Sequence, residues 1–116
     1  MNIKRGEVWL ANLDPTIGSE IQKTRPVVVV SNDVNNTNNN VITVLPITSN
    51  VTKVFSFEVL LPKGIANLPK DSKAKADQIR TLDKSRFAKR IGSLPTSFIT
   101  DIEKAILKHL GMEPTD

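Results

Sequence analysis

Two side chains that could take part in a reaction lie beside the most apolar stretches of this chain. Arg25 directly precedes the run Pro26 to Val30, and Thr48 directly follows the run Val41 to Ile47. Both runs are rich in β-branched residues, which is typical of buried strands. Rigid strands can aim side chains from the loops at their ends, so this guanidinium and this hydroxyl are the candidates for chemistry at a site. From position alone the simpler interpretation is favoured: Arg25 is an ordinary surface residue and Thr48 only ends its strand, because strand ends commonly carry such residues.

The residue inventory excludes several other kinds of site. The sequence has no cysteine and a single histidine, His109, so neither a two-histidine ribonuclease nor a Cys/His zinc site fits within one chain. Gly18 and Gly64 stand alone, which excludes a glycine-rich phosphate loop. Carboxylates are not clustered along the chain, although separate loops could bring some together. His109 is better interpreted as a cation at a helix end than as a catalyst. We expect no metal and no cofactor.

Composition favours an anionic partner and a location in the cytoplasm. The 16 Lys and Arg residues exceed the 12 Asp and Glu residues, which gives a net charge of +4. A positive balance favours nucleic acid as the first candidate partner, although charge alone leaves the odds about even. No apolar segment follows the charged start Met1 to Arg5, and the longest aliphatic run, Val27 to Val30, is far shorter than the ~20 residues of a membrane helix. We therefore expect neither export nor membrane insertion.

The elements that must position these residues are mostly strands. Apolar and polar residues alternate, and turn-forming pairs such as Asp14-Pro15 and Gly18-Ser19 separate the alternating stretches. Within the third strand, Pro46 predicts a bulge or a sheet edge. We expect strands over Val8 to Leu13, Pro26 to Val30, Val41 to Ile47, Phe55 to Leu61, Ala74 to Thr81 and Phe87 to Ile91.

The segments between the strands are predicted from their turn residues. Asn32 to Asn40 holds six asparagines in nine residues and is interpreted as a polar loop, and Pro62 to Ser72 is interpreted as a second loop. Asp83 is expected to cap a single helical turn. Phe55 and Phe57 are interpreted as core residues rather than as platforms for stacked bases.

One amphipathic helix is predicted near the end of the chain. Ile99, Ile102, Ile106 and Leu110 recur at helical spacing. Thr96 or Ser97 is expected to cap its start, and Gly111 and Pro114 are expected to end it. Five to seven short strands and one terminal helix indicate a mainly β (α+β) domain spanning 1–116, a small barrel with a helix packed on it.

Several stretches, in the same order along the chain, resemble the MazF/PemK/Kid family of toxin endoribonucleases. The most specific is Gly18 to Ser31, which contains Lys23-Thr24-Arg25-Pro26. The similarity covers nearly the whole chain. It continues in Arg5 to Trp9, Leu45 to Thr48, Ala76 to Asp83 and Ala105 to Gly111.

This resemblance implies a fold, an activity and partners. The family has an SH3-like β-barrel with a C-terminal helix, forms homodimers, and cleaves single-stranded RNA without a metal to 2′,3′-cyclic phosphate and 5′-hydroxyl ends. A cognate acidic antitoxin neutralises it. By the same resemblance, Arg25 and Thr48 fall on the catalytic positions. The residues expected to bind RNA are Ser19, Glu20, Lys23, Thr24, Ser49, Gln78 and Arg80.

The sequence departs from the family pattern at two places. Many relatives have glycine where this chain has Lys23-Thr24, and the added charge is expected to change how the protein binds RNA. Lys73 and Lys75 stand where relatives are often apolar, so that strand is expected to face solvent or a partner. Two alternatives stay open: an RNA-binding barrel without activity, and a gyrase-inhibiting toxin of the same fold. The polar ending Glu113 to Asp116 disfavours the second, which would act through an apolar C-terminal end.

Overall fold

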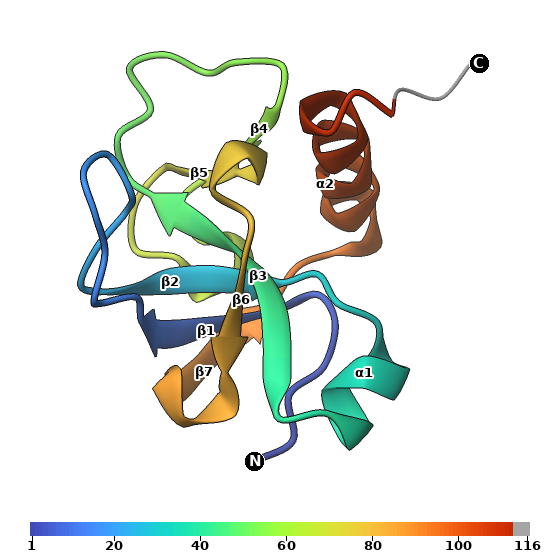
Figure 1. Cartoon of the computed structure of the whole chain (residues 1–116). Coiled ribbons are helices and arrows are strands. Elements are labelled where there is room, and N and C mark those ends of the chain that lie inside the picture. Colours follow the sequence, from blue (N-terminus) through green and yellow to red (C-terminus); the bar gives the residue numbers. More distant parts are fainter. Residues whose placement is uncertain (113–116) are drawn as a thin grey trace.

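Seven antiparallel strands form one strongly curled sheet, and a C-terminal helix packs against it (Figure 1). The computed structural model describes residues 1–112. The strands are β1 Glu7–Asn12, β2 Thr24–Val29, β3 Val41–Thr48, β4 Glu58–Leu61, β5 Ser72–Lys75, β6 Arg80–Asp83 and β7 Phe87–Ser93. The helices are α1 Asp33–Asn38 and α2 Thr96–His109, with single 3-10 turns η1 Ile65–Asn67, η2 Ala76–Gln78 and η3 Lys84–Arg86.

The sheet order is β4-β5-β3-β2-β1-β7, and β6 also pairs with β3. The hydrogen-bonded path between β4 and β7 is not closed, but the curled strands and the C-terminal helix match an SH3-like barrel. The predicted fold class is therefore confirmed. No helix within residues 1–112 is both long and apolar enough to cross a membrane.

The central strand β2 is buried on both faces, as its valine run predicts. Val27 and Val29 point into one core cluster with Trp9 and Phe87, whose rings meet edge to face with centroids 6.0 Å apart. Val28 points into a second cluster, which lies between the sheet and Ile102 on α2. Because the two clusters fix β2 from both sides, the residue at its start, Arg25, projects from a rigid element.

Strand β3 changes its partner at Pro46. Its first half pairs with β6 through Val44, and its last two residues, Ile47 and Thr48, pair with β5. Pro46 lies between these two partners, so its missing N–H interrupts neither ladder. The register with β2 is unbroken at Pro46, and no bulge occurs on that side. The predicted bulge is absent, and the predicted sheet edge is limited to the gap between β6 and β5 at Pro46.

The Asn-rich segment is a short helix, not a loop. The Asn32 side chain accepts a hydrogen bond from the Asn35 N–H at 2.8 Å and caps the start of α1. Asn36 is buried and donates to the carbonyl oxygen of Ser31 at 2.9 Å. Asparagine side chains form hydrogen bonds with backbone N–H and carbonyl groups at both ends of this segment. Composition alone does not distinguish asparagines that cap a helix from asparagines that form a turn.

The predicted strand Phe55 to Leu61 is wrong in its first half. β4 begins at Glu58, and the Phe55 side chain is 44% exposed, so Phe55 is not a core residue. Phe57 is half-buried and stacks on Phe55 with ring centroids 5.3 Å apart. Phe57 also packs against the core cluster that contains Ile102, so it is a core-edge residue, while Phe55 lies at the surface.

The caps near the C-terminus are partly as predicted. Asp83 caps η3 by accepting a hydrogen bond from the Ser85 N–H at 2.8 Å. Gly111 ends α2 in a left-handed conformation with φ +72°, also as predicted. The start of α2 is different, because Pro95 occupies the N-cap and neither predicted hydroxyl caps it. Pro114 and the ending Glu113 to Asp116 lie outside the described residues.

Gly92 on β7 is required by a close backbone approach. A Cβ at this position would lie 2.6 Å from the carbonyl oxygen of Ala66 in η1. That turn is itself held in a left-handed conformation, with φ +48° at Ala66. Neighbouring Asn67 ties the two segments together by donating to the Ile91 carbonyl at 3.0 Å. A side chain at position 92 would separate η1 from the sheet.

Candidate active site

Arg25 and Thr48 line the same pocket. Strands β2 and β3 are antiparallel neighbours with Val27 opposite Pro46, so the start of β2 lies beside the end of β3. The pocket has a volume of about 210 Å³. Its lining consists of Arg25, Pro26, Ile47, Thr48, Ser49, Leu68, Pro69, Lys70 and Ser72. Two residues that are 23 positions apart in the chain are thus brought into one cavity, together with the predicted Ser49.

The polar atoms of this pair remain available to a ligand. Arg25 uses only its Nε, which donates to the Gln22 carbonyl at 3.1 Å, and no carboxylate pairs with it in the described chain. The Thr48 hydroxyl oxygen accepts from the Asn50 N–H at 3.3 Å, which leaves its hydrogen free to donate. A guanidinium and a hydroxyl at one cavity can together donate hydrogen bonds to a phosphate.

A second pocket, of about 380 Å³, gathers three of the residues expected to bind RNA: Glu20, Gln78 and Arg80. The loop between β1 and β2 reaches this pocket because the Ile21 N–H donates to the Gln78 side-chain oxygen at 3.3 Å. Glu20 itself accepts from the Ile17 N–H at 2.6 Å, which closes the loop on itself.

Three other predicted residues line neither pocket. Ser19 is exposed in the loop between β1 and β2. Lys23 has φ +69°, and its N–H donates to Asp14 at 3.1 Å, so this residue shapes the loop end. Thr24 begins β2 opposite Asn12.

Between these two pockets lies a third, also of about 210 Å³, whose residues the sequence did not predict as a site. It is lined by Ile21, Thr48, Asn50, Lys73 and Lys75. Thr48 therefore belongs to two pockets at once. Lys73 is the cross-strand partner of Thr48 in the β3/β5 ladder. The pairing of Lys73 with Thr48 could not be predicted from the periodicity of the sequence, because it depends on the register between β3 and β5.

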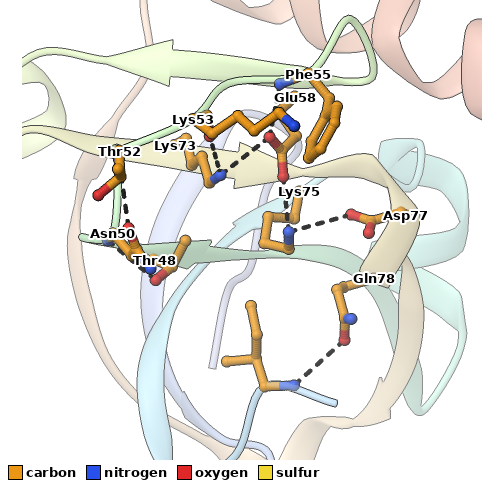
Figure 2. Close-up of polar contacts among 11 residues, drawn as sticks. Thr48, Asn50, Thr52, Lys53, Phe55, Glu58, Lys73, Lys75, Asp77 and Gln78 are labelled. Atoms are coloured by element: carbon orange, nitrogen blue, oxygen red, sulfur yellow. Dashed lines mark hydrogen bonds and ion pairs between the residues drawn. The ribbon is translucent and has the colours of Figure 1, made fainter. Parts of the chain in front are cut away.

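Glu58 is the buried centre of a charged cluster beside Thr48, shown in Figure 2. One carboxylate oxygen accepts from Lys73 at 3.0 Å and from the Phe55 N–H at 2.8 Å, and the other accepts from Lys75 at 2.6 Å. Lys73 also donates to the Lys53 carbonyl at 2.5 Å. The expectation that the β5 lysines face solvent or a partner is wrong for Lys73, whose side chain is only 9% exposed.

The cluster keeps Glu58 charged. Burial raises the pKa of the Glu58 carboxyl, but the hydrogen bonds from Lys75, from the Phe55 N–H and from Lys73 together outweigh burial, so the pKa lies below its ordinary value. An anionic Glu58 holds two ammonium groups in fixed positions on the β5 strand. It also ties down the loop between β3 and β4, through Phe55 and Lys53.

Metal ligands are not grouped in the described part of the chain. No three or more His, Cys, Asp or Glu side chains within residues 1–112 lie where they could hold an ion together. His109 lies in the last turn of α2, with its ring centroid 5.9 Å from that of Phe57, and it is not among the lining residues of the three pockets described above.

The fold and the pockets together define a small curled-sheet protein with a pocket at the junction of two central strands that Arg25, Thr48 and Lys70 line. Residues 4–110 match the family described as PemK-like, MazF-like toxin of type II toxin-antitoxin system. The chain therefore belongs to the PemK/MazF-like toxin family.

Known relatives cover almost the whole chain. Endoribonuclease MazF9 from Mycobacterium tuberculosis is 41% identical over 115 residues, which span 95% of this chain and 98% of that protein. The crystal structure of MazF (Form-I) from Deinococcus radiodurans superposes with a TM-score of 0.84 at 27% identity and covers 97% of this chain and 99% of its own. MazF in a MazE-MazF crystal structure (Form-I) from the same organism has a TM-score of 0.72, also at 27% identity, with the same coverage.

Proposed function

We propose that this protein is a toxin endoribonuclease that cleaves single-stranded RNA, mRNA in the cell, in a sequence-specific and metal-independent way. The observation that carries the proposal is that Arg25 and Thr48 line one pocket and keep side-chain donors that no protein group uses. The similarity to a protein named endoribonuclease, at 41% identity, supports it. We place the protein in the cytoplasm, where mRNA is found.

The reaction uses a nucleophile that RNA itself supplies. The 2′-hydroxyl oxygen attacks the adjacent phosphorus, the bond from phosphorus to the 5′-oxygen breaks, and the products are a 2′,3′-cyclic phosphate and a free 5′-hydroxyl. Alignment of this attack contributes up to ~7–11 kcal/mol in well-oriented systems. DNA lacks the nucleophile and resists cleavage.

Arg25 and Thr48 have different roles in this reaction. The planar Arg25 fork pairs with two oxygens of the phosphorane and stabilises its developing charge. Arginine stays protonated in proteins, so Arg25 acts as an electrostatic stabiliser or a proton donor, and not as the general base. Thr48 donates its hydroxyl to a phosphate oxygen and fixes the orientation of the group.

The RNA strand extends from this site toward Gln78 and Arg80. Ser49 lies in the same pocket as the catalytic pair, and Glu20, Gln78 and Arg80 share the neighbouring one. We assign Ser19, Lys23 and Thr24 to the loop edge of the same groove, from their place between Gly18 and Arg25.

We further propose that the protein acts as a homodimer and is neutralised by a cognate acidic antitoxin. The similar D. radiodurans toxin occurs in a MazE-MazF complex, which supports a protein partner for this chain. A net charge of +4 suits an acidic partner that covers the RNA groove.

The test is incubation of the purified protein with mixed single-stranded RNA in EDTA, alongside an Arg25→Ala variant and an Arg86→Ala variant. Arg86 is a matched control because it lines none of the three pockets described here and its guanidinium bonds to backbone carbonyls of the β1 end. Wild type and Arg86→Ala should cleave, and Arg25→Ala should not. Activity that vanishes in EDTA and returns with magnesium would overturn the mechanism.

A further inference from the structure

Lys73 and Lys75 lie on the same face of β5 as each other, because residues two apart in a strand point the same way. The residue between them, Ala74, is fully buried in the core on the other face. Both lysines line the pocket that Thr48 shares with Asn50. Figure 2 shows this arrangement, with the two lysines between Glu58 and Thr48.

Glu58 aligns these ammonium groups, because each lysine donates to one of its carboxylate oxygens. Lys75 also forms an ion pair with Oδ1 of Asp77 at 3.7 Å, beyond hydrogen-bond distance, so two carboxylates balance the two ammonium charges. Each ammonium has three N–H donors, and the bonds to Glu58 and the Lys53 carbonyl use two on Lys73 and one on Lys75. One donor on Lys73 and two on Lys75 therefore remain for the oxygens of an anion.

The position of this pocket identifies the anion. Thr48 stands between it and the Arg25 pocket, so a group bound by Lys73 and Lys75 is the immediate neighbour of a phosphate bound by Arg25 and Thr48. A nucleic acid strand presents phosphates at a regular spacing along one continuous chain. A strand whose scissile phosphate lies at Arg25 therefore brings the next phosphate to the lysine pair.

We propose that Lys73 and Lys75, aligned by Glu58, form a second phosphate-binding subsite for the phosphate adjacent to the scissile one. This rests on the proposed function of the protein as an RNA-cleaving enzyme. The two lysines are positioning residues for the strand, and Glu58 acts through them.

The test measures binding of labelled, mixed-sequence single-stranded DNA, which the enzyme does not cleave, as a function of salt. The variants are Lys75→Gln, Lys75→Arg and the control Lys89→Gln, an exposed lysine on β7 at the far end of the sheet path. Lys75 is chosen because its side chain is more exposed than that of Lys73, 19% against 9%, and because a glutamine amide at this position can still donate to Glu58. Circular dichroism and RNA cleavage are followed on the same samples.

Lys75→Gln should bind more weakly at low salt, and its slope of log affinity against log salt should be shallower by about 0.7, the value of one phosphate contact on a single strand. That difference amounts to about fivefold less affinity lost per tenfold rise in salt. Lys75→Arg and Lys89→Gln should keep the wild-type slope.

Two results would contradict the subsite in different ways. If wild type binds DNA and cleaves RNA while Lys75→Gln, folded by circular dichroism, keeps the wild-type slope, the subsite is wrong and the proposed function stands. If wild type neither binds DNA nor cleaves RNA, the proposed function is wrong, and the subsite, which rests on that function, is wrong too. A Lys89→Gln slope reduced as much as that of Lys75→Gln would show a diffuse charge effect and would also overturn the subsite.

Discussion

Arg25 and Thr48 offer different chemistry to a bound phosphate. The guanidinium carries a permanent charge and five donors in a fixed plane, whereas the hydroxyl offers one donor whose direction is set by the β3 strand end. The Asn50 N–H occupies one lone pair of the Thr48 oxygen, and the hydroxyl hydrogen stays available to donate. In the mechanism that we propose, charge stabilisation and orientation are thus divided between two residues.

The role of Thr48 can be tested by changing the hydroxyl and keeping the shape. Thr48→Val should lower kcat/KM for RNA by about 10²–10³, the cost of losing one preorganised donor, while Thr48→Ser should keep most of the rate. Thr48 is half-buried at a strand end, so the melting temperature of both variants should change little. Single-turnover cleavage assays and thermal unfolding measure the two effects. A Thr48→Val enzyme with wild-type kinetics would remove Thr48 from the mechanism.

Strand ends made Arg25 and Thr48 candidates, but only the family resemblance assigned them to catalytic positions, and the structure places both in one pocket. Neither argument indicated the cluster of Glu58, Lys73 and Lys75. Their contacts join β4, β5 and the loop before β4 through strand register, and register leaves no local signal in the chain.

At the scale of elements, the β4/β5 pair is held by a buried carboxylate rather than by apolar contacts alone. Glu58 lies opposite Lys75 in the ladder, and its hydrogen bond from the Phe55 N–H fixes the preceding loop. The loop between β3 and β4 follows Thr48 directly, so the order of this loop and the geometry of the site depend on the same side chain.

Glu58 should make stability depend on pH in one direction. Its pKa in the folded protein lies below the ordinary value of 4.5, so the carboxylate contributes stability above that pH and loses it as pH falls through the folded pKa. Glu58→Gln should lower the free energy of unfolding by about 1–3 kcal/mol at neutral pH. The gap to wild type should shrink as the pH falls below 4.5.

Urea unfolding at a series of pH values measures this gap. Asp33 and Asp83 also have lowered pKa values, but they are present in both proteins and cancel in the difference. Glu103→Gln is the control, because Glu103 pairs with Arg5 at a half-exposed site. A gap between wild type and Glu58→Gln that stays constant from neutral to acid pH would show that the charge of Glu58 contributes nothing.

The elements differ in how well local sequence predicted them. β2 and α2 have strong periodic signals, since the valine run is buried on both faces and the isoleucines of α2 recur at helical spacing. The helix α1 was missed because its asparagines form caps through side chains, which composition does not reveal. The start of β4 was predicted too early, because Phe55 and Phe57 alternate with Ser56 as residues of a strand would. In the structure the two rings stack on each other in the loop before β4.

At the scale of the whole molecule, the net positive charge of +4 suits the two anionic partners that we propose. RNA and the acidic tail of an antitoxin are both expected on the surface that carries Arg25, Lys75 and Arg80. The homodimer that we propose would present this surface twice. A disordered tail that folds on binding spends part of its contact energy on ordering.

RNA and an acidic antitoxin peptide should therefore compete. Labelled, uncleavable RNA bound to the Arg25→Ala variant should be displaced by the peptide, and both affinities should fall as salt rises, RNA more steeply if it makes several phosphate contacts. Fluorescence anisotropy at several salt concentrations measures both. Simultaneous binding of RNA and peptide without mutual loss of affinity would place the inhibitor on a remote face.

The central claim is that the protein aligns the RNA's own 2′-hydroxyl for attack at the site of Arg25 and Thr48. The most direct measurement first maps a cleaved bond in EDTA, and then replaces the 2′-hydroxyl of the nucleotide on its 5′ side by hydrogen. We predict that the unmodified RNA gives a 2′,3′-cyclic phosphate and a 5′-hydroxyl, and that the modified RNA binds but stays intact at that bond. Cleavage of the modified RNA at the same bond and the same rate would contradict the account, because the nucleophile would then come from elsewhere.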